Sequence, residues 1–369
     1  MKVGIVGLPN AGKSSLFNAL TRQRADMAMY PFSTVEPNVA TVQVPDDRLD
    51  AIVETVEAKP TVYETIEFHD IAGLVEGAHR GEGLGNQFLA NIREVDAIVH
   101  VVRAFGNELV AHTQGRIDPV GDIEIVETEL LYADLEQAER RLDKVRREAK
   151  SGDREKLAEL DWIKQLVDAL QSGRPARTVP VSEDAPDALR NLQPLTAKPV
   201  LYLANVDEDA GGGDGGPQGA PPPPPDIQAY ALDHKARAAA VSARIECELN
   251  DLDAEDAAAM RSDLGIATTS LSTVVGEAWK LLGLISFFTA GEGKEGRAWA
   301  ISDGTSARRA AGRIHTDIEK GFVAAEIISW RDLVEIGGYA AARERGKLRV
   351  EGRDYVMRDG DVMTVRFTP

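Results

Sequence analysis

The stretch "GLPNAGKSS", from Gly7 to Ser15, decides the fold of this chain. It contains the pattern Gly-x-x-x-x-Gly-Lys-Ser, in which Gly7, Gly12, Lys13 and Ser14 hold the defined positions. The glycines let the loop wrap so that backbone N–H groups point at phosphate oxygens, and the next helix adds its positive N-terminal end. Lys13 would reach the β- and γ-phosphates, and Ser14 would ligate Mg²⁺. The stretch therefore predicts a nucleotide-binding site with contacts from Asn10, Ala11, Gly12, Lys13, Ser14 and Ser15.

Apolar strands and helices alternate around this loop. "KVGIVGL" predicts a buried strand before it, and "KSSLFNALTRQ" predicts a helix after it. This alternation is typical of an α/β fold, in which helices cover both faces of a mostly parallel sheet. Further strands of that sheet are expected at residues 64–71, 96–102, 198–206 and 238–243.

Residues 122–197 differ in character from the sheet-forming segments. Apolar residues of their first part have heptad spacing, and "KSGD" at 150–153 interrupts the pattern before a second apolar stripe begins. We expect an antiparallel helical hairpin inserted into the sheet domain. The outer face of its first arm, "ERRLDKVRREAK", is either a solvated helix face or a patch that faces RNA or the ribosome. The two apolar stripes are Leu131, Leu135, Ala138, Leu142, Val145 and Ala149, then Leu160, Ile163, Val167 and Leu170.

Two further regions have a distinct composition. "GGGDGGPQGAPPPPP" at 211–225 cannot build a core, because glycine is too flexible and proline lacks a donor, so residues 210–226 are expected to form a surface loop. Residues 285–367 carry short strand signals, among them "YVMR" at 355–358, around one helical segment at 306–321. They predict a compact mixed domain that is too short for a second nucleotide-binding sheet.

A second phosphate-site signal follows the loop in the expected order. "DIAG" ends a strand, so Asp70 can hold Mg²⁺ through water while the Gly73 amide senses the γ-phosphate. Thr34, within "YPFSTVEPN", is either an ordinary loop threonine or a residue that closes on Mg²⁺ and the γ-phosphate. Ras-like enzymes place a water-orienting glutamine after this glycine, whereas this chain has Leu74. Another group must then orient the water, and His79 and His112 are candidates.

The base-recognition segment is "LYLANVDED", at 201–209. Guanine-specific proteins have Asn-Lys-x-Asp here, but this chain has Val206 in place of the lysine and Glu208 in place of the aspartate. The longer carboxylate of Glu208 spoils the paired hydrogen bonds to guanine. Asn205 would either bond the adenine edge or tie this segment to the phosphate loop, and Ser242 and Ala243 would offer backbone contacts to the base. The residues weaken the prediction of guanine without proving adenine.

This set of motifs resembles the Obg-like ATPase family, also called YchF. The resemblance rests on "GLPNAGKSS", "YPFSTVEPN", "DIAGLVEGAHRGEGLGNQFLANIRE", "NVDE", "HTDIEKGF" and "DGDVMTVRF", and it covers nearly the whole chain. It implies a P-loop NTPase domain of the OBG type, the inserted helical hairpin, and a C-terminal TGS domain of β-grasp shape. The implied bounds are 1–121 with 198–284, then 122–197, then 285–367. The glycine- and proline-rich tract is foreign to the family pattern.

The resemblance also implies an activity. Family members prefer ATP, hydrolyse it with a hydrophobic residue in the position of Leu74, and associate with ribosomes. It assigns the catalytic set Lys13, Thr34, Gly73 and His112, with His112 preferred over His79. It places Mg²⁺ on Ser14, Thr34 and Asp70, and a potassium ion near Asn10. The TGS domain would contact RNA through the basic stretch "RERGKLRVEGRDYVMR".

Composition limits the remaining choices. A net charge of -18 argues against indiscriminate binding to nucleic acid or anionic membrane, so we expect neither a DNA nor a membrane partner. One cysteine excludes an internal disulfide, and no apolar run is long enough to span a membrane, which predicts a cytoplasmic protein. The expected function is a Mg²⁺-dependent ATPase switch with ribosome and rRNA partners. A GTP-dependent factor, or a nucleotide-gated RNA or protein adaptor with incidental hydrolysis, stays open.

Overall fold

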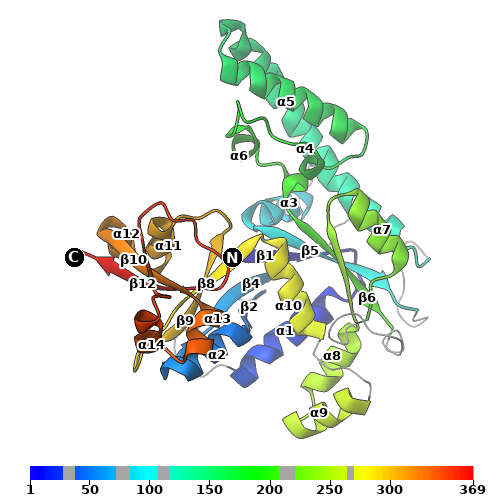
Figure 1. The fold of residues 1–369 in the computed structure, drawn as a ribbon. Helices are drawn as coiled ribbons and strands as arrows, with labels where there is room; N and C mark the ends of the chain where they lie inside the picture. The colour runs from blue at the N-terminus through cyan, green and yellow to red at the C-terminus, as the bar shows by residue number, and fades with distance from the viewer. Residues whose placement is uncertain (28–37, 72–83, 107–115, 208–220, 264–269, 369) are drawn as a thin grey trace. The chain divides into compact units, whose positions relative to one another are not determined.

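The computed structural model describes residues 1–27, 38–71, 84–106, 116–207, 221–263 and 270–368 (Figure 1). The chain divides into two compact units. Unit 1 comprises Met1–Val42 with Glu67–Leu282, and unit 2 comprises Gln43–Ile66 with Gly283–Pro369. This division differs from the expected bounds, because residues 43–66 were expected inside the nucleotide-binding domain and instead group with the C-terminal residues. The domain bounds otherwise stay a prediction.

A six-stranded sheet carries unit 1, with the order β2-β4-β1-β5-β6-β7. The pairs β1–β4, β1–β5, β5–β6 and β6–β7 are all parallel, which confirms the predicted α/β class. Because parallel strands run in the same direction, the C-terminal ends of β1, β4, β5, β6 and β7 lie along one edge of the sheet. The strands are β1 Lys2–Val6, β2 Val39–Val44, β4 Glu64–Asp70, β5 Ala97–Ala104, β6 Val200–Val206 and β7 Arg237–Val241.

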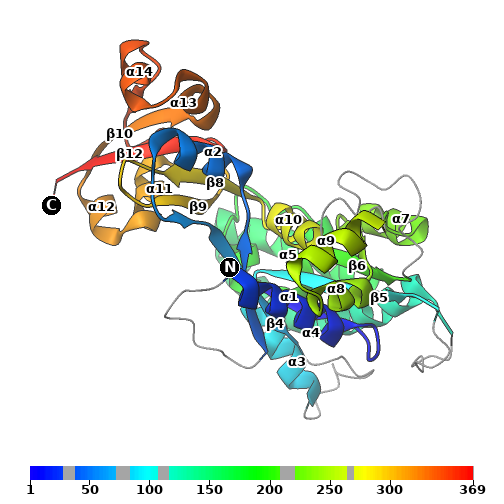
Figure 2. The same cartoon turned by 90° about the horizontal axis from the view of Figure 1, so that it is seen from below.

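Helices cover both faces of this sheet (Figure 2). One face packs against α3, α4 and α7 in a single apolar cluster that includes Phe88, Val126 and Ile227. Side chains alternate along a strand, so Leu201 and Leu203 of β6 point to the opposite face, where α10 contacts the strands. The helices of unit 1 outside the hairpin are α1 Lys13–Met27, α3 Leu84–Glu94, α6 Ala188–Leu192, α7 Pro225–Asp233, α8 Ala243–Asn250, α9 Ala254–Asp263 and α10 Ser270–Leu281.

The predicted helical hairpin is present in unit 1. Its arms are α4 Pro119–Glu148 and α5 Arg154–Gln171, and they pack through a shared apolar cluster. Between them Gly152 has a φ of 77°, and Asp153 caps α5 by accepting a hydrogen bond from the Glu155 N–H. The heptad spacing located the buried seam, since Ala138, Leu142, Val145 and Ala149 are all at most 8% exposed.

The sheet of unit 2 has the order β11-β10-β12-β8-β9-β3. The β8–β9 and β10–β12 pairs are antiparallel and β12 lies parallel to β8, with α11 between β9 and β10 in the chain, as expected for a β-grasp. Residues 43–66 join this unit because β3 pairs with β9 and α2 packs against α13. The elements are α2 Asp47–Val56, β3 Thr61–Val62, β8 Leu284–Thr289, β9 Gly296–Ser302, α11 Ala307–Ile314, α12 Thr316–Lys320, β10 Phe322–Ser329, α13 Trp330–Ile336, α14 Tyr339–Glu344, β11 Arg349–Glu351 and β12 Asp361–Phe367.

Two local expectations for unit 2 need correction. The helical segment expected at 306–321 is two helices, because His315 adopts an extended φ of -163° between α11 and α12. The strand signal at 355–358 forms only an isolated bridge between Ser306 and Val356. Throughout the described ranges, every helix is too short or too polar to cross a membrane.

Candidate nucleotide-binding site

A cavity of about 560 Å³ opens at the edge of the unit 1 sheet where the parallel strands end. Its lining combines the loop after β1 with the segments that follow β5, β6 and β7, as expected for a ligand site in an open α/β sheet. Nine residues expected to bind nucleotide lie on it. These are Asn10, Gly12, Lys13, Ser14, Ser15, Asn205, Val206, Ser242 and Ala243.

Two glycines of the phosphate loop are required by space as well as by conformation. Gly7 has a φ of 150°, and a Cβ there would lie 2.3 Å from the carbonyl oxygen of Val101. Gly12 has a φ of 99°, and a Cβ there would lie 2.2 Å from Nδ2 of Asn205. The loop therefore wraps closely against two neighbouring strands, as expected for a loop whose amides bind phosphate.

Lys13 lines the phosphate side of the cavity, and Asp70, which does not line it, lies near enough for the two charges to interact. The Lys13 ammonium donates a hydrogen bond to the carbonyl oxygen of Leu8, 2.8 Å away. Burial lowers the pKa of Lys13, and the charge of Asp70 opposes that shift. Burial likewise raises the pKa of Asp70, and Lys13 opposes it. A triphosphate bound here would add negative charge beside Lys13 and favour its protonated form.

The oxygen donors at this end fit Mg²⁺. Ser14 offers a hydroxyl at the start of α1, and Asp70 offers a carboxylate at the end of β4. Among the described residues, no group of three or more His, Cys, Asp or Glu side chains could hold a metal ion by itself. Mg²⁺ commonly takes only one or two protein ligands and completes its shell with phosphate oxygens and water. This donor set therefore suits a nucleotide-bound Mg²⁺ better than an all-protein metal site.

The Asn205 side chain joins two segments beside the cavity and is called the brace below. Its Nδ2 donates to the Ala11 carbonyl oxygen at 3.1 Å, and its Oδ1 accepts from the Ala243 N–H at 3.0 Å. The side chain is only 6% exposed. Of the two roles considered for it, the geometry matches the tie between the phosphate loop and the segment after β7. Ala11 itself does not line the cavity but supplies the acceptor for this tie.

Ser242 contributes an unsatisfied polar atom next to the cavity. It is 6% exposed, and its Oγ has no hydrogen-bond partner within the part of the chain that the structure describes. A buried hydroxyl without a partner costs free energy, so such a group is commonly satisfied by a ligand or water. Ser242 therefore offers a hydroxyl to a ligand or a water beside the cavity.

Five lining residues were not expected from the sequence. Phe105 and Gly106 follow β5, Asp207 follows β6, and Arg244 and Cys247 lie on α8. The register explains the first three, because Arg103 lies opposite Asn205 and Ala104 opposite Val206. A residue just beyond β5 therefore meets one just beyond β6. The sequence places Phe105, Gly106 and Asp207 directly after two buried strands. That position predicts their proximity only when the order of the strands is known.

Several predicted residues cannot be placed. Thr34, Gly73, Leu74, His79, His112 and Glu208 lie outside the residues that the structure describes. Their roles in hydrolysis and base choice therefore stay predictions.

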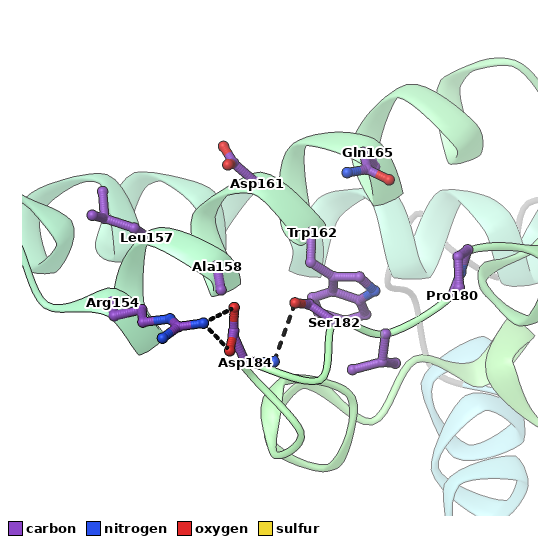
Figure 3. A pocket seen from close by; sticks show the side chains of 10 residues that line it. Arg154, Leu157, Ala158, Asp161, Trp162, Gln165, Pro180, Ser182 and Asp184 are labelled. Carbon is purple, nitrogen blue, oxygen red and sulfur yellow. Dashed lines mark hydrogen bonds and ion pairs between the residues drawn. The ribbon is translucent and has the colours of Figure 1, made fainter.

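A second cavity, of about 490 Å³, lies on the hairpin between α5 and residues 180–184 (Figure 3). Trp162, only 3% exposed, forms one wall, and Arg154 pairs with Asp184 at 3.0 Å across the opening. Neither glycine nor lysine is among its lining residues, so it lacks the components of a phosphate cradle. Of these two cavities, the one at the sheet edge has the components of a phosphate cradle and the one on the hairpin does not.

Two family models match the chain. Residues 284–368 match the YchF-GTPase_C model, which is described as a protein of unknown function. Residues 2–129 match a model described as a 50S ribosome-binding GTPase.

Full-length relatives are also found. The "Ribosome-binding ATPase YchF" of Bacillus subtilis is 45% identical over 367 residues, covering 100% of this chain and 99% of the relative. The protein of the same name from Escherichia coli O157:H7 is 44% identical, with 99% of each covered. A solved structure described as the Schizosaccharomyces pombe YchF GTPase superposes with a TM-score of 0.85 at 35% identity, covering 99% of this chain and 97% of that one.

Proposed function

The chain belongs to the YchF family, and from that membership and the cavity at the sheet edge we propose that it is a Mg²⁺-dependent ATPase that acts as a ribosome-bound switch. The observation that carries the proposal is the cavity itself, where the phosphate loop with Lys13 is joined to the base segment by the hydrogen bonds of Asn205. The names of the full-length relatives support both hydrolysis of ATP and ribosome binding.

In the proposed complex the phosphates lie against the loop amides, with Lys13 on the β- and γ-phosphates. Ser14, Asp70 and Thr34 would hold Mg²⁺, which neutralises charge that develops on the phosphates. Asn10 lines the same cavity at a φ of 64°, and its side chain is proposed to contribute to a potassium site beside the phosphates. ATP would order Thr34 and Gly73, and hydrolysis would release them.

Hydrolysis needs an oriented water, and Leu74 cannot orient one. We assign this role to His112. His112→Ala should slow turnover and leave ATP affinity unchanged. Turnover at the wild-type rate would remove His112 from the mechanism.

The choice of ATP rests on the base segment. Asn205 is committed to the brace, Val206 replaces the usual lysine, and Glu208 replaces the aspartate that pairs with guanine. A site built to pair with guanine loses discrimination when that pairing is broken. Ser242, whose Oγ has no hydrogen-bond partner among the described residues, would receive the adenine edge, while the Ala243 N–H is already bonded to Asn205.

The decisive measurement compares the affinities of ATP and GTP on one sample of the full chain with Mg²⁺ present. We expect tighter binding of ATP. Tighter binding of GTP would favour the second candidate function, a GTP-dependent factor, which has support in the description of the S. pombe structure as a GTPase.

The proposed ribosome contact is the basic outer face of the hairpin. Arg140 and Lys144 are 71% and 63% exposed, and within the described residues they form ion pairs with Glu136 and Glu148, each one turn away on the same helix. Such pairs contribute little, so the charges stay available to RNA phosphates. In unit 2, Arg343 of the basic stretch pairs with Glu326, which is only 12% exposed, so this arginine is held more firmly than Arg140 and Lys144 are. Binding to rRNA through the hairpin is therefore favoured, and a protein that binds ribosomes is expected to act in the cytoplasm.

Co-sedimentation with ribosomes tests this contact. Arg140→Glu with Lys144→Glu should weaken pelleting and make it less dependent on salt, because phosphate contacts are lost. Arg174→Glu with Arg190→Glu makes the same change of charge at two other exposed positions and should pellet like wild type. Equal pelleting in a non-hydrolysable ATP analogue and in ADP would instead count against a nucleotide switch.

A further inference from the structure

Two short segments form one wall of the nucleotide cavity. Phe105 and Gly106 follow β5, and Asp207 follows β6. The Gly106 N–H donates a hydrogen bond to Oδ2 of Asp207, at 2.8 Å. This bond connects residues 101 positions apart in the chain, and it joins the two segments just beyond the last paired residues of their strands.

The same wall is supported from behind by Arg103. Its guanidinium lies over the Phe105 ring at 4.5 Å from the centroid, and its Nε donates to the Phe105 carbonyl oxygen at 3.4 Å. Arg103 is 3% exposed and lies opposite Asn205 in the β5–β6 register. Arg103 therefore contacts both the ring and the carbonyl oxygen of Phe105, and Asp207 accepts a hydrogen bond from the Gly106 N–H.

We propose that Asp207 is a positioning residue that fixes the Phe105–Gly106 wall and thereby sets the affinity of the site for the base of the nucleotide. The proposal rests on the nucleotide-binding function proposed above. Asp207 acts through the backbone of Gly106 and does not itself select the base. A bond between a carboxylate and an N–H is of the stronger, charge-assisted kind, so it can hold a short loop segment in place.

The alternative role for this carboxylate is to read guanine. Asp207 stands two residues after Asn205, whereas the guanine-reading aspartate stands three residues after its asparagine. Its Oδ2 is already engaged by Gly106, so a side-by-side pair of bonds from guanine would compete with this contact. The two roles differ in one respect, because positioning needs only an acceptor atom while guanine reading needs the charged pair of oxygens.

Two substitutions separate these roles. Asp207→Ala removes the acceptor, and Asp207→Asn keeps one carbonyl oxygen but removes the charge. The matched control is Asp233→Ala, which removes a carboxylate whose side chain is 87% exposed on α7. Each full-length variant is titrated with Mg²⁺–nucleotide and, separately, with inorganic tripolyphosphate, which engages the phosphate side alone. The nucleotide used is whichever of ATP and GTP the wild type binds more tightly, so a wrong base assignment leaves the test of Asp207 intact.

We expect Asp207→Ala to weaken nucleotide binding about tenfold, the size of one lost hydrogen bond to a charged group. Tripolyphosphate affinity should stay within about twofold of wild type in every variant, and Asp207→Asn should retain most of the nucleotide affinity. Unchanged nucleotide affinity in Asp207→Ala would overturn the proposal. An equal loss for tripolyphosphate would also overturn it, since it would indicate general damage, and a loss in Asp207→Asn as large as in Asp207→Ala would show that charge and not positioning is required.

Discussion

The phosphate half and the base half of the nucleotide cavity are built in different ways. The phosphate half comes from one continuous stretch, Gly7 to Ser15, whose backbone supplies most of the chemistry. The base half is assembled from side chains on three segments, near Phe105, Asn205 and Ser242, that meet only because β5, β6 and β7 are neighbours. Backbone chemistry tolerates little change in sequence, whereas an assembled pocket can change its ligand through single substitutions. The first half should therefore determine whether a nucleotide binds, and the second should determine which one.

The largest effect is expected in the phosphate half. Lys13→Ala removes the one lysine that lines the cavity in the described residues, and charge-assisted bonds to phosphate oxygens are lost with it. Affinity for both ATP and GTP should fall about 100-fold or more, which corresponds to at least about 2.7 kcal/mol. Titration calorimetry on the full chain measures this loss. Equal ATP binding by the variant and the wild type would contradict the assignment of the phosphate site.

The next effect tests the link between the two halves. Asn205→Ala removes the bonds to Ala11 and Ala243 and leaves a buried carbonyl and a buried N–H without partners. We expect the free energy of unfolding to fall by about 2 kcal/mol, and affinity to fall for nucleotide and for tripolyphosphate alike. Urea unfolding and the two titrations measure this. If only nucleotide binding suffered, Asn205 would be a base contact and not a brace.

The same contrast explains how much could be predicted. Gly7, Gly12, Lys13 and Ser14 were predictable because their role depends on local backbone geometry at fixed spacing. Asp207 and Phe105 were not, because their proximity depends on the register of two strands that lie about a hundred residues apart in the chain. Base-half residues with a known motif, such as Asn205, were found only through that motif.

How well the fold could be predicted also depended on how far apart in the chain the interacting residues lie. The hairpin was predicted because a long heptad seam is a strong periodic signal, and its arms span 30 and 18 residues. The helices α13 and α14 were missed because 7 and 6 residues carry little periodicity. Residues 43–66 were assigned to the wrong neighbours, because only the long-range pairing of β3 with β9 reveals where they belong.

A smaller effect is expected from the base half alone. Val206→Lys combined with Glu208→Asp rebuilds the guanine pattern Asn-Lys-x-Asp in this chain. The ratio of GTP to ATP affinity should rise about tenfold, or about 1.4 kcal/mol, because the paired acceptors for guanine are restored. Competition of each nucleotide against a fluorescent analogue measures the ratio, and tripolyphosphate binding should not change. An unaltered ratio would mean that the base half selects its ligand through other residues.

The smallest effect concerns the sheet beneath both halves. His100 lies on β5 opposite Val6, 2% exposed, with its ring edge-on to Tyr202 at 5.8 Å. Burial lowers its pKa to about 4; the charge of Glu127 opposes this shift and that of Lys13 adds to it. In the unfolded chain the His100 imidazole takes up a proton below about pH 6.5, whereas in the folded chain it stays neutral down to about pH 4. The free energy of unfolding therefore falls as the pH falls through this window.

Between pH 7 and pH 5.5 this single group should cost the wild type about 1 kcal/mol of unfolding free energy. His100→Phe keeps an aromatic ring against Tyr202 and removes the titration, so its stability should fall by about 1 kcal/mol less over the same interval. If His100→Phe and wild type lost stability equally, a group other than His100 would cause the pH dependence. The acid sensitivity of the chain would then not originate in the strands that carry the nucleotide site.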